Sequence, residues 1–98
     1  MVVDIMIESQ ETRSERRKKT IHRIHRIQGQ LTALERQIDA DHTCEDLVIQ
    51  ARASEKATAS LITHMVQGYL QHQVKETMRQ DPEQAVAEIG RVFQLINQ

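Results

Sequence analysis

The fold is decided by residues 14–39, which read SERRKKTIHRIHRIQGQLTALERQID. Aliphatic residues recur in this stretch at steps of three and four, namely Ile21, Ile24, Ile27, Leu31, Leu34 and Ile38. Such steps place them on one side of a helix, because an α-helix has about 3.6 residues per turn. No part of the chain alternates apolar and polar residues over the length of a strand. The sequence therefore predicts an all-α fold that begins with a helix over about 14–39.

A second and longer helical pattern covers about 44–79. Thr43 and Asp46 have the spacing of a capping box at its start, with Asp in place of the usual Glu. A helix of this length is about 50 Å long. Its middle is rich in small residues, namely Ala51, Ala53, Ser54, Ala57, Ala59 and Ser60, which allow a neighbouring helix to come close. Asp81 and Pro82 then form a typical helix start, so a third helix is predicted over about 82–96.

These three helices predict a long antiparallel hairpin followed by a short C-terminal helix. The chain has 98 residues with one Phe, one Tyr and no Trp, so it can bury little apolar surface by itself. We therefore expect an obligate dimer with a four-helix bundle, or a dimer of dimers. Residues 1–12 show neither a cap nor an apolar face. They are expected to form a flexible arm ahead of a single helical domain over 13–98.

The formal net charge of −1 hides a segregated pattern. Residues 13–26 carry a charge of +6, whereas residues 1–12 carry −3 and residues 27–98 carry −4. A basic block of this kind indicates contact with nucleic acid, and the alternative is a solvated helix end. Its basic face is expected to lie opposite a packed stripe that contains Ile21 and Ile24. The residues predicted to contact DNA phosphates are Arg16, Lys18, Lys19, Arg23 and Arg26.

Several classes of protein are excluded or disfavoured by the composition. No apolar run reaches the 18 or so residues of a membrane span, and the mean hydropathy is −0.55. The start of the chain lacks the basic and apolar regions of a secretory signal. A single cysteine cannot form a disulfide within one chain, which favours a reducing cytoplasm. No catalytic triad or phosphate-binding loop is present, so we expect no enzyme.

Cys44 is the only cysteine, and it opens the second predicted helix. It is either a small apolar residue with a packing role or the site at which an effector acts. His42 is two residues away, whereas His72 lies about 42 Å along a continuous helix and can meet only the Cys44 of a second, antiparallel chain. His64 and His72 do not have the spacing of a metal-binding pair on one helix turn. His42 could share a metal with Cys44, and a site that also takes His64 or His72 from the helix would cross a dimer interface.

Residues 23–36 (RIHRIQGQLTALER), residues 41–44 (DHTC) and then Gln50 resemble the CsoR/RcnR/FrmR family of small bacterial repressors. The resemblance is strong over about 18–53 and stays in register to about residue 76. It implies an all-helical, disc-shaped dimer of dimers that releases operator DNA when an effector reaches the cysteine. Members sense copper(I), nickel or cobalt, formaldehyde, or sulfur species. The resemblance places the DNA-binding arginine at Arg23 and the effector thiol at Cys44.

The chain departs from this family at the metal-ligand positions. Tyr69 and Gln73 stand where metal-sensing members have a His and a Cys or His, and Lys19 stands at the N-terminal ligand position. His72 is one residue out of register, about 100° around an α-helix. The chain begins Met1-Val2, without the N-terminal Pro of formaldehyde sensors. The kind of effector therefore stays open.

The sequence thus predicts a cytoplasmic repressor that binds double-stranded operator DNA and further copies of itself, and that has no membrane partner. Its operator affinity is expected to be controlled at Cys44 by a transition metal ion or a thiol-reactive small molecule. The alternative is a helical-bundle adaptor that binds another protein and senses no effector.

Overall fold

The computed structural model describes residues 11–98, which form helices and short connections without a strand. The all-α prediction is confirmed. Except for its last two residues, the predicted N-terminal arm lies outside the described residues. The helical segments are α2 (Arg13–Asp39), α3 (Cys44–Gly68), the π-helix η1 (Tyr69–Val74), α4 (Lys75–Gln80) and α5 (Pro82–Ile96). Within the described part of the chain, no helix combines the length and the apolar character needed to cross a membrane.

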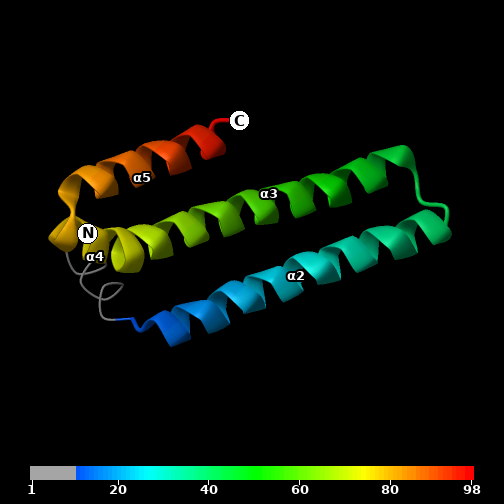
Figure 1. The fold of residues 1–98 in the computed structure, drawn as a ribbon. Helices are drawn as coiled ribbons and strands as arrows, with labels where there is room; N and C mark the ends of the chain where they lie inside the picture. The colour runs from blue at the N-terminus through cyan, green and yellow to red at the C-terminus, as the bar shows by residue number, and fades with distance from the viewer. Residues whose placement is uncertain (1–10) are drawn as a thin grey trace, which may run out of the picture. The chain divides into compact units, whose positions relative to one another are not determined.

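The first of two compact units comprises Ser14–Met65 and contains the predicted antiparallel hairpin. Figure 1 shows α2 and α3 side by side with opposite chain directions, joined at one end by a short loop. Polar side chains link the two helices directly, for example Arg16 with His64 and Gln50 with Gln30. The hairpin prediction is thereby confirmed for this unit.

The loop between the two helices is set by hydrogen bonds of the backbone. Asp41 adopts a left-handed conformation with φ 59°, and its N–H donates to the Ile38 carbonyl over 3.1 Å. The N–H of His42 donates to the Gln37 carbonyl over 3.0 Å. This pair of bonds is a Schellman motif, which satisfies the last carbonyls of α2. Thr43 Oγ1 then accepts from the Asp46 N–H over 3.2 Å, as the capping spacing predicted.

The side of α2 that faces α3 is mostly polar. Its half-buried and buried residues recur at steps of three and four, namely Arg16, Thr20, Arg23, Ile27, Gln30, Leu34 and Gln37. The corresponding residues of α3 are Leu47, Gln50, Ser54, Ala57, Leu61 and His64. This is the spacing of the seam between two helices of a coiled coil. Small side chains on α3 leave room there for the long polar side chains of α2. We call these two rows of residues the polar seam.

Most of the aliphatic stripe of α2 lies outside the polar seam. Ile21 is 45% exposed, Leu31 46% and Ile38 56%. Within one chain, Arg23 lies on the side that packs against α3, and Ile21 and Ile24 are exposed, so α3 does not cover the stripe that was expected to pack opposite the basic face. The physical reason is the polar seam itself, which brings polar side chains between α2 and α3 and leaves the aliphatic ones facing outward.

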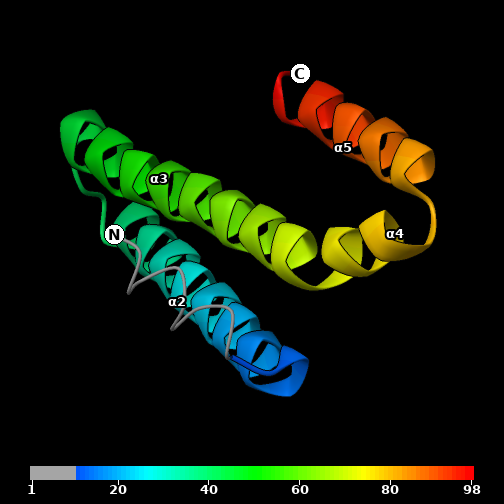
Figure 2. The same cartoon turned by 90° about the vertical axis from the view of Figure 1, so that its left-hand side faces the viewer.

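The second unit includes Val66–Gln98. In it, α5 packs against α4 and η1, and Figure 2 shows the chain reversing its direction between α4 and α5. The predicted start of α5 is confirmed, since the Asp81 side chain accepts from the Gln84 N–H over 3.2 Å and Pro82 follows it. Val74 and Ala85 are the buried apolar residues among those described.

The predicted helix over 44–79 is helical throughout, but it is not a uniform α-helix. Residues 69–74 form the π-helix η1, in which hydrogen bonds join residues five apart. A π turn holds more residues than an α turn, so faces assigned at about 3.6 residues per turn do not extend past Tyr69. The angle between His72 and the ligand position at residue 73 is therefore that of a π-helix and not the 100° of an α-helix.

Candidate functional site

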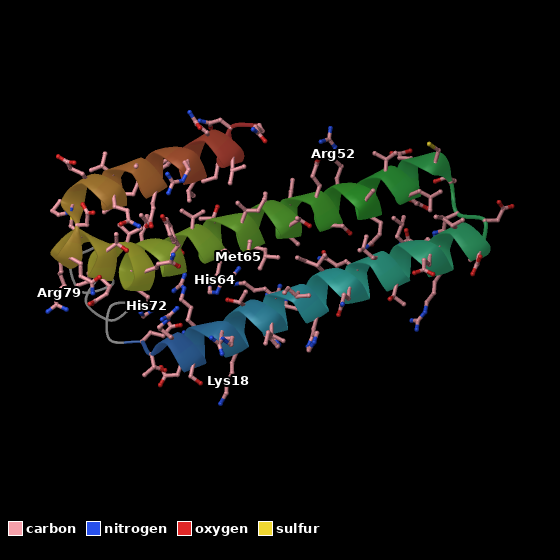
Figure 3. All side chains as sticks on the ribbon, viewed as in Figure 1. Lys18, Arg52, His64, Met65, His72 and Arg79 are labelled. Atoms are coloured by element: carbon pink, nitrogen blue, oxygen red, sulfur yellow. The ribbon has the colours of Figure 1, made fainter. Side chains whose placement is uncertain are left out.

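The predicted DNA-contacting residues occupy two different environments in the hairpin. Lys18, Lys19 and Arg26 are exposed, whereas Arg23 is half-buried and Arg16 is buried. Figure 3 shows the Lys18 side chain directed away from α3. The exposed residues present positive charge along α2, which suits contact with a polyanion.

Arg16 is held inside the polar seam and is only 7% exposed. Its Nη2 donates to the His64 carbonyl over 2.7 Å and lies 3.3 Å from Nδ1 of the same residue. The Nη2 group of this guanidinium is therefore engaged within the hairpin. The structure thus separates Arg16 from the exposed cations with which the sequence grouped it.

His64 engages both of its ring nitrogens with α2. Nε2 lies 2.8 Å from Thr20 Oγ1, and that hydroxyl donates to the Arg16 carbonyl over 2.9 Å. The hydroxyl must then accept from an Nε2–H, while Nδ1 accepts from Arg16. Figure 3 shows the side chain directed toward α2. Since the residue is 6% exposed, a metal could reach either nitrogen only by breaking the polar seam.

Arg23 is connected to α3 through a neutral partner. Its Nη1 donates to Ser60 Oγ over 3.1 Å. A small cavity of about 70 Å³ beside this bond is lined by Arg23, Arg26, Gln30, Ala57 and Ser60. One wall is fixed by Gln50, whose Nε2 donates to the Gln30 carbonyl over 3.1 Å.

The sequence did not single out Gln30 or Ser60 as site residues. Gln30 lies within the family-like motif, and Ser60 lies in the stretch of small residues. The signal that could have found Gln30 is the regular spacing of the polar seam, in which polar residues take the positions usually filled by aliphatic ones.

Cys44 is a free, exposed thiol at the first residue of α3. His42 is also exposed, and its Nδ1 lies 3.6 Å from the Asp46 carboxylate. The described residues of one chain contain no group of three or more His, Cys, Asp or Glu side chains that could hold a metal ion. Cys44 and its neighbours therefore do not fit a complete metal site within a single chain.

Tyr69 occupies the position at which metal-sensing members of the resembled family have a histidine. Its hydroxyl donates to Glu88 Oε2 over 3.3 Å, which links η1 to α5. Partial burial, the negative charge of Glu88 and this hydrogen bond raise the pKa of Tyr69, and the nearby Arg91 opposes them. Tyr69 is thus a link within the second unit.

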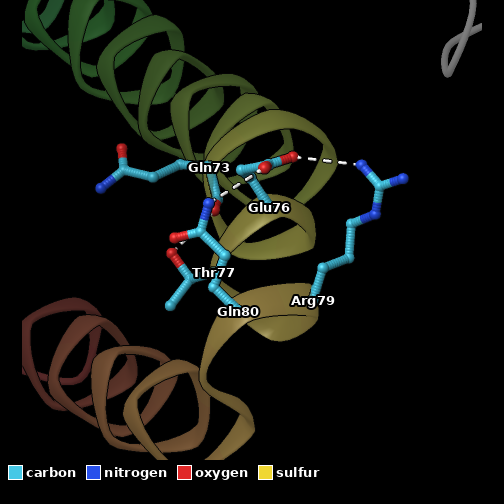
Figure 4. Close-up of polar contacts among 5 residues, drawn as sticks. All are labelled: Gln73, Glu76, Thr77, Arg79 and Gln80. Carbon is cyan, nitrogen blue, oxygen red and sulfur yellow. Dashed lines mark hydrogen bonds and ion pairs between the residues drawn. The ribbon is translucent and has the colours of Figure 1, made fainter.

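Gln73, the other substituted ligand position, is exposed and followed by a local polar network (Figure 4). Its backbone carbonyl accepts from Thr77 Oγ1 over 3.1 Å. Glu76 pairs with Arg79 at 3.3 Å and accepts from Gln80 at 3.2 Å. These contacts span one helical turn each, so they stabilise α4 locally. His72, in the same segment, is half-buried, and its Nε2 has no hydrogen-bond partner among the described residues.

Residues 16–95 match a protein family described as metal-sensitive transcriptional repressor. The copper-sensing transcriptional repressor CsoR of Bacillus subtilis (strain 168) is 27% identical over 81 residues, which cover 82% of this chain and 80% of that protein. No solved structure matches the chain.

Proposed function

The chain belongs to the family of metal-sensitive transcriptional repressors, which are not enzymes, and from this premise we propose that it represses transcription by binding operator DNA under the control of an effector at Cys44. The effector is a metal ion or a thiol-reactive small molecule. The protein works in the cytoplasm as a dimer or a dimer of dimers.

The exposed cations of α2 are the main observation that supports DNA binding. Lys18, Lys19 and Arg26 lie within a segment of charge +6, and they reach solvent along one helix. Lysine and arginine side chains in such an array bind the phosphate backbone of a duplex with little dependence on sequence. Arg23, although half-buried, also belongs to the residues that bind phosphates in this proposal. Arg16 does not, because its guanidinium bonds inside the polar seam.

Self-association is supported by the aliphatic residues that the hairpin leaves outside. Ile24, Leu31 and Ile38 follow one another at seven-residue steps on α2, and each is more than a third exposed. Apolar rows of this kind are typical of helix faces that pack against another helix. A second copy of the chain supplies a matching row, because dimers of identical chains use the same surface twice.

The sensor role of Cys44 is supported by its exposure and by its position on α3. The same helix carries Gln50, Ser60 and His64, which hold α2. A change in α3 would therefore reach the basic helix. If the effector is a metal, Cys44 and His42 need further ligands from a second chain. His72 is the better candidate for that role, because His64 is enclosed in the polar seam.

The sensor role can be tested by titrating a protein–DNA complex with effectors. The duplex is selected from a random library for binding to the intact chain. Copper(I), nickel, cobalt, formaldehyde and a thiol oxidant are then added separately, and DNA release is followed by fluorescence anisotropy. At least one of them should release DNA from the wild type and not from Cys44→Ser. An equal response of the two proteins would contradict sensing at Cys44, while leaving DNA binding intact.

His42→Ala separates the two kinds of effector. A metal held by both side chains should bind this variant more weakly, whereas a covalent adduct on the Cys44 thiol should still form. Native mass spectrometry of the same samples measures the mass that each effector adds to the chain.

A further inference from the structure

The small cavity between α2 and α3 has the size of an ion site. Its volume of about 70 Å³ is well below the roughly 300 Å³ at which pockets for organic ligands begin. Arg23 and Arg26 bring two guanidinium groups to it, and Ser60 and Gln30 bring neutral polar groups. No carboxylate is among the residues that line it. A single small anion is the ligand that fits this charge and size.

The two arginines differ from others of the chain in their partners. Arg52 lies 2.8 Å from Glu55, and Arg79 lies 3.3 Å from Glu76. Figure 3 shows Arg52 on the side of α3 away from α2. Arg23 instead donates to the uncharged Ser60, and Arg26 has no hydrogen bond or ion pair within the described residues. Two guanidinium groups that share a cavity without a carboxylate favour an anion between them.

The neutral groups of the cavity favour an anion with several oxygen atoms. Ser60 Oγ accepts from Arg23 and retains its own hydrogen, which can be donated to a ligand. Gln30 brings the N–H donors of its side-chain amide, which a phosphate oxygen can accept. A phosphate-type anion accepts several such bonds in different directions and suits the fork of donors on a guanidinium group.

We infer that this cavity binds one phosphate-type oxyanion per chain, held by Arg23 and Arg26, with Ser60 as the residue that orients Arg23. The anion is either a phosphodiester of DNA or a free phosphate. In the first case the inference rests on the proposed function and describes how the hairpin receives one backbone phosphate. In the second case it adds a small-anion site that does not require DNA.

The test is calorimetric titration of the intact chain with inorganic phosphate, compared with chloride at equal ionic strength. One phosphate should bind per chain. Arg26→Gln should weaken binding at least tenfold, and Ser60→Ala about two- to tenfold, since it removes one hydrogen bond. Arg52→Gln is the matched control, because it removes an arginine that is paired with Glu55, and it should bind phosphate like the wild type. Circular dichroism checks that each variant keeps its helices.

Addition of duplex DNA identifies the source of the anion. Competition between phosphate and DNA supports a backbone phosphodiester, and simultaneous binding supports a free phosphate. Phosphate binding in a chain that does not bind DNA would contradict the proposed function and leave the anion site standing. The inference is overturned if phosphate binds no better than chloride, or if Arg52→Gln weakens it as much as Arg26→Gln does.

Discussion

Arg16 places a guanidinium group within the polar seam, where its Nη2 donates to the His64 carbonyl over 2.7 Å. Its neighbour Arg17 is exposed. Removal of a buried arginine leaves its hydrogen-bond partners unpaired. This lowers the free energy of unfolding far more than the removal of a surface charge does. Arg16 therefore stabilises the hairpin, although it belongs to the basic segment.

Replacement of Arg16 tests this assignment. We predict that Arg16→Ala lowers the free energy of unfolding by about 2 kcal/mol, because the variant lacks a charged hydrogen bond and leaves the His64 carbonyl without this donor. Arg17→Ala should change it by about 0.5 kcal/mol or less. Urea unfolding, followed by circular dichroism at one protein concentration, measures both. Equal effects of the two substitutions would show that Arg16 is not a structural residue.

Tyr69 gives a prediction about pH, since it is the only tyrosine of the chain. Its pKa is raised in the folded protein by burial and by Glu88. The stability that this link contributes is therefore complete below the ordinary tyrosine pKa of about 10 and is lost as the pH rises through the folded value. Tyrosinate absorbance should appear at higher pH in the native chain than in the urea-unfolded chain.

Glu88→Gln provides the matched comparison for this titration. It removes the negative charge and should move the Tyr69 pKa toward its ordinary value. Glu83→Gln, an exposed change on the same helix, should leave the native titration unaltered. Coincident titrations of native and unfolded wild type would rule out the link between Tyr69 and Glu88.

Among the elements, the loop between α2 and α3 carries a residue in an unfavourable conformation. Asp41 has φ 59°, a region in which glycine has no steric penalty. We predict that Asp41→Gly raises the free energy of unfolding by about 0.5–1 kcal/mol. Gln28→Gly, an exposed change within α2, should instead lower it by about 1 kcal/mol. Thermal unfolding measures both, and destabilisation by Asp41→Gly would contradict the strain assigned to this loop.

The helices and their connections also show which features could be predicted from the sequence. Helix starts depend on residues close together in the chain, so the caps at Thr43 and Asp81 were predicted correctly. The face of α2 that meets α3 depends on the partner helix, and of the predicted aliphatic stripe only Ile27 and Leu34 lie on it. Arg16 and Arg23 could not be distinguished in the sequence from Lys18, because only the small side chains of α3 determine which cation is enclosed. The π-helix η1 has no pattern in the sequence that distinguishes it from an α-helix.

For the molecule as a whole, we expect a hairpin that has a polar seam and leaves aliphatic residues exposed to need a partner. Leu31 is 46% exposed in the middle of α2. We predict that Leu31→Glu converts the self-associated protein into a monomer, because a charge would be buried in the interface without a partner. Thr32→Glu, an exposed change next to it, should keep the wild-type mass. Sedimentation equilibrium measures the mass, and an unchanged mass of Leu31→Glu would place the interface elsewhere.

DNA binding by α2 is best tested by the affinity of the intact protein for duplex DNA as a function of salt. Binding should weaken steeply as salt increases. The slope of log affinity against log salt should decrease by about one in Lys18→Ala and in Arg26→Ala, because each substitution removes one cation that binds a phosphate. Arg52→Ala should retain the wild-type slope. An affinity that does not change with salt, or a Lys18→Ala slope equal to that of the wild type, would contradict phosphate binding by α2 and favour a protein-binding adaptor.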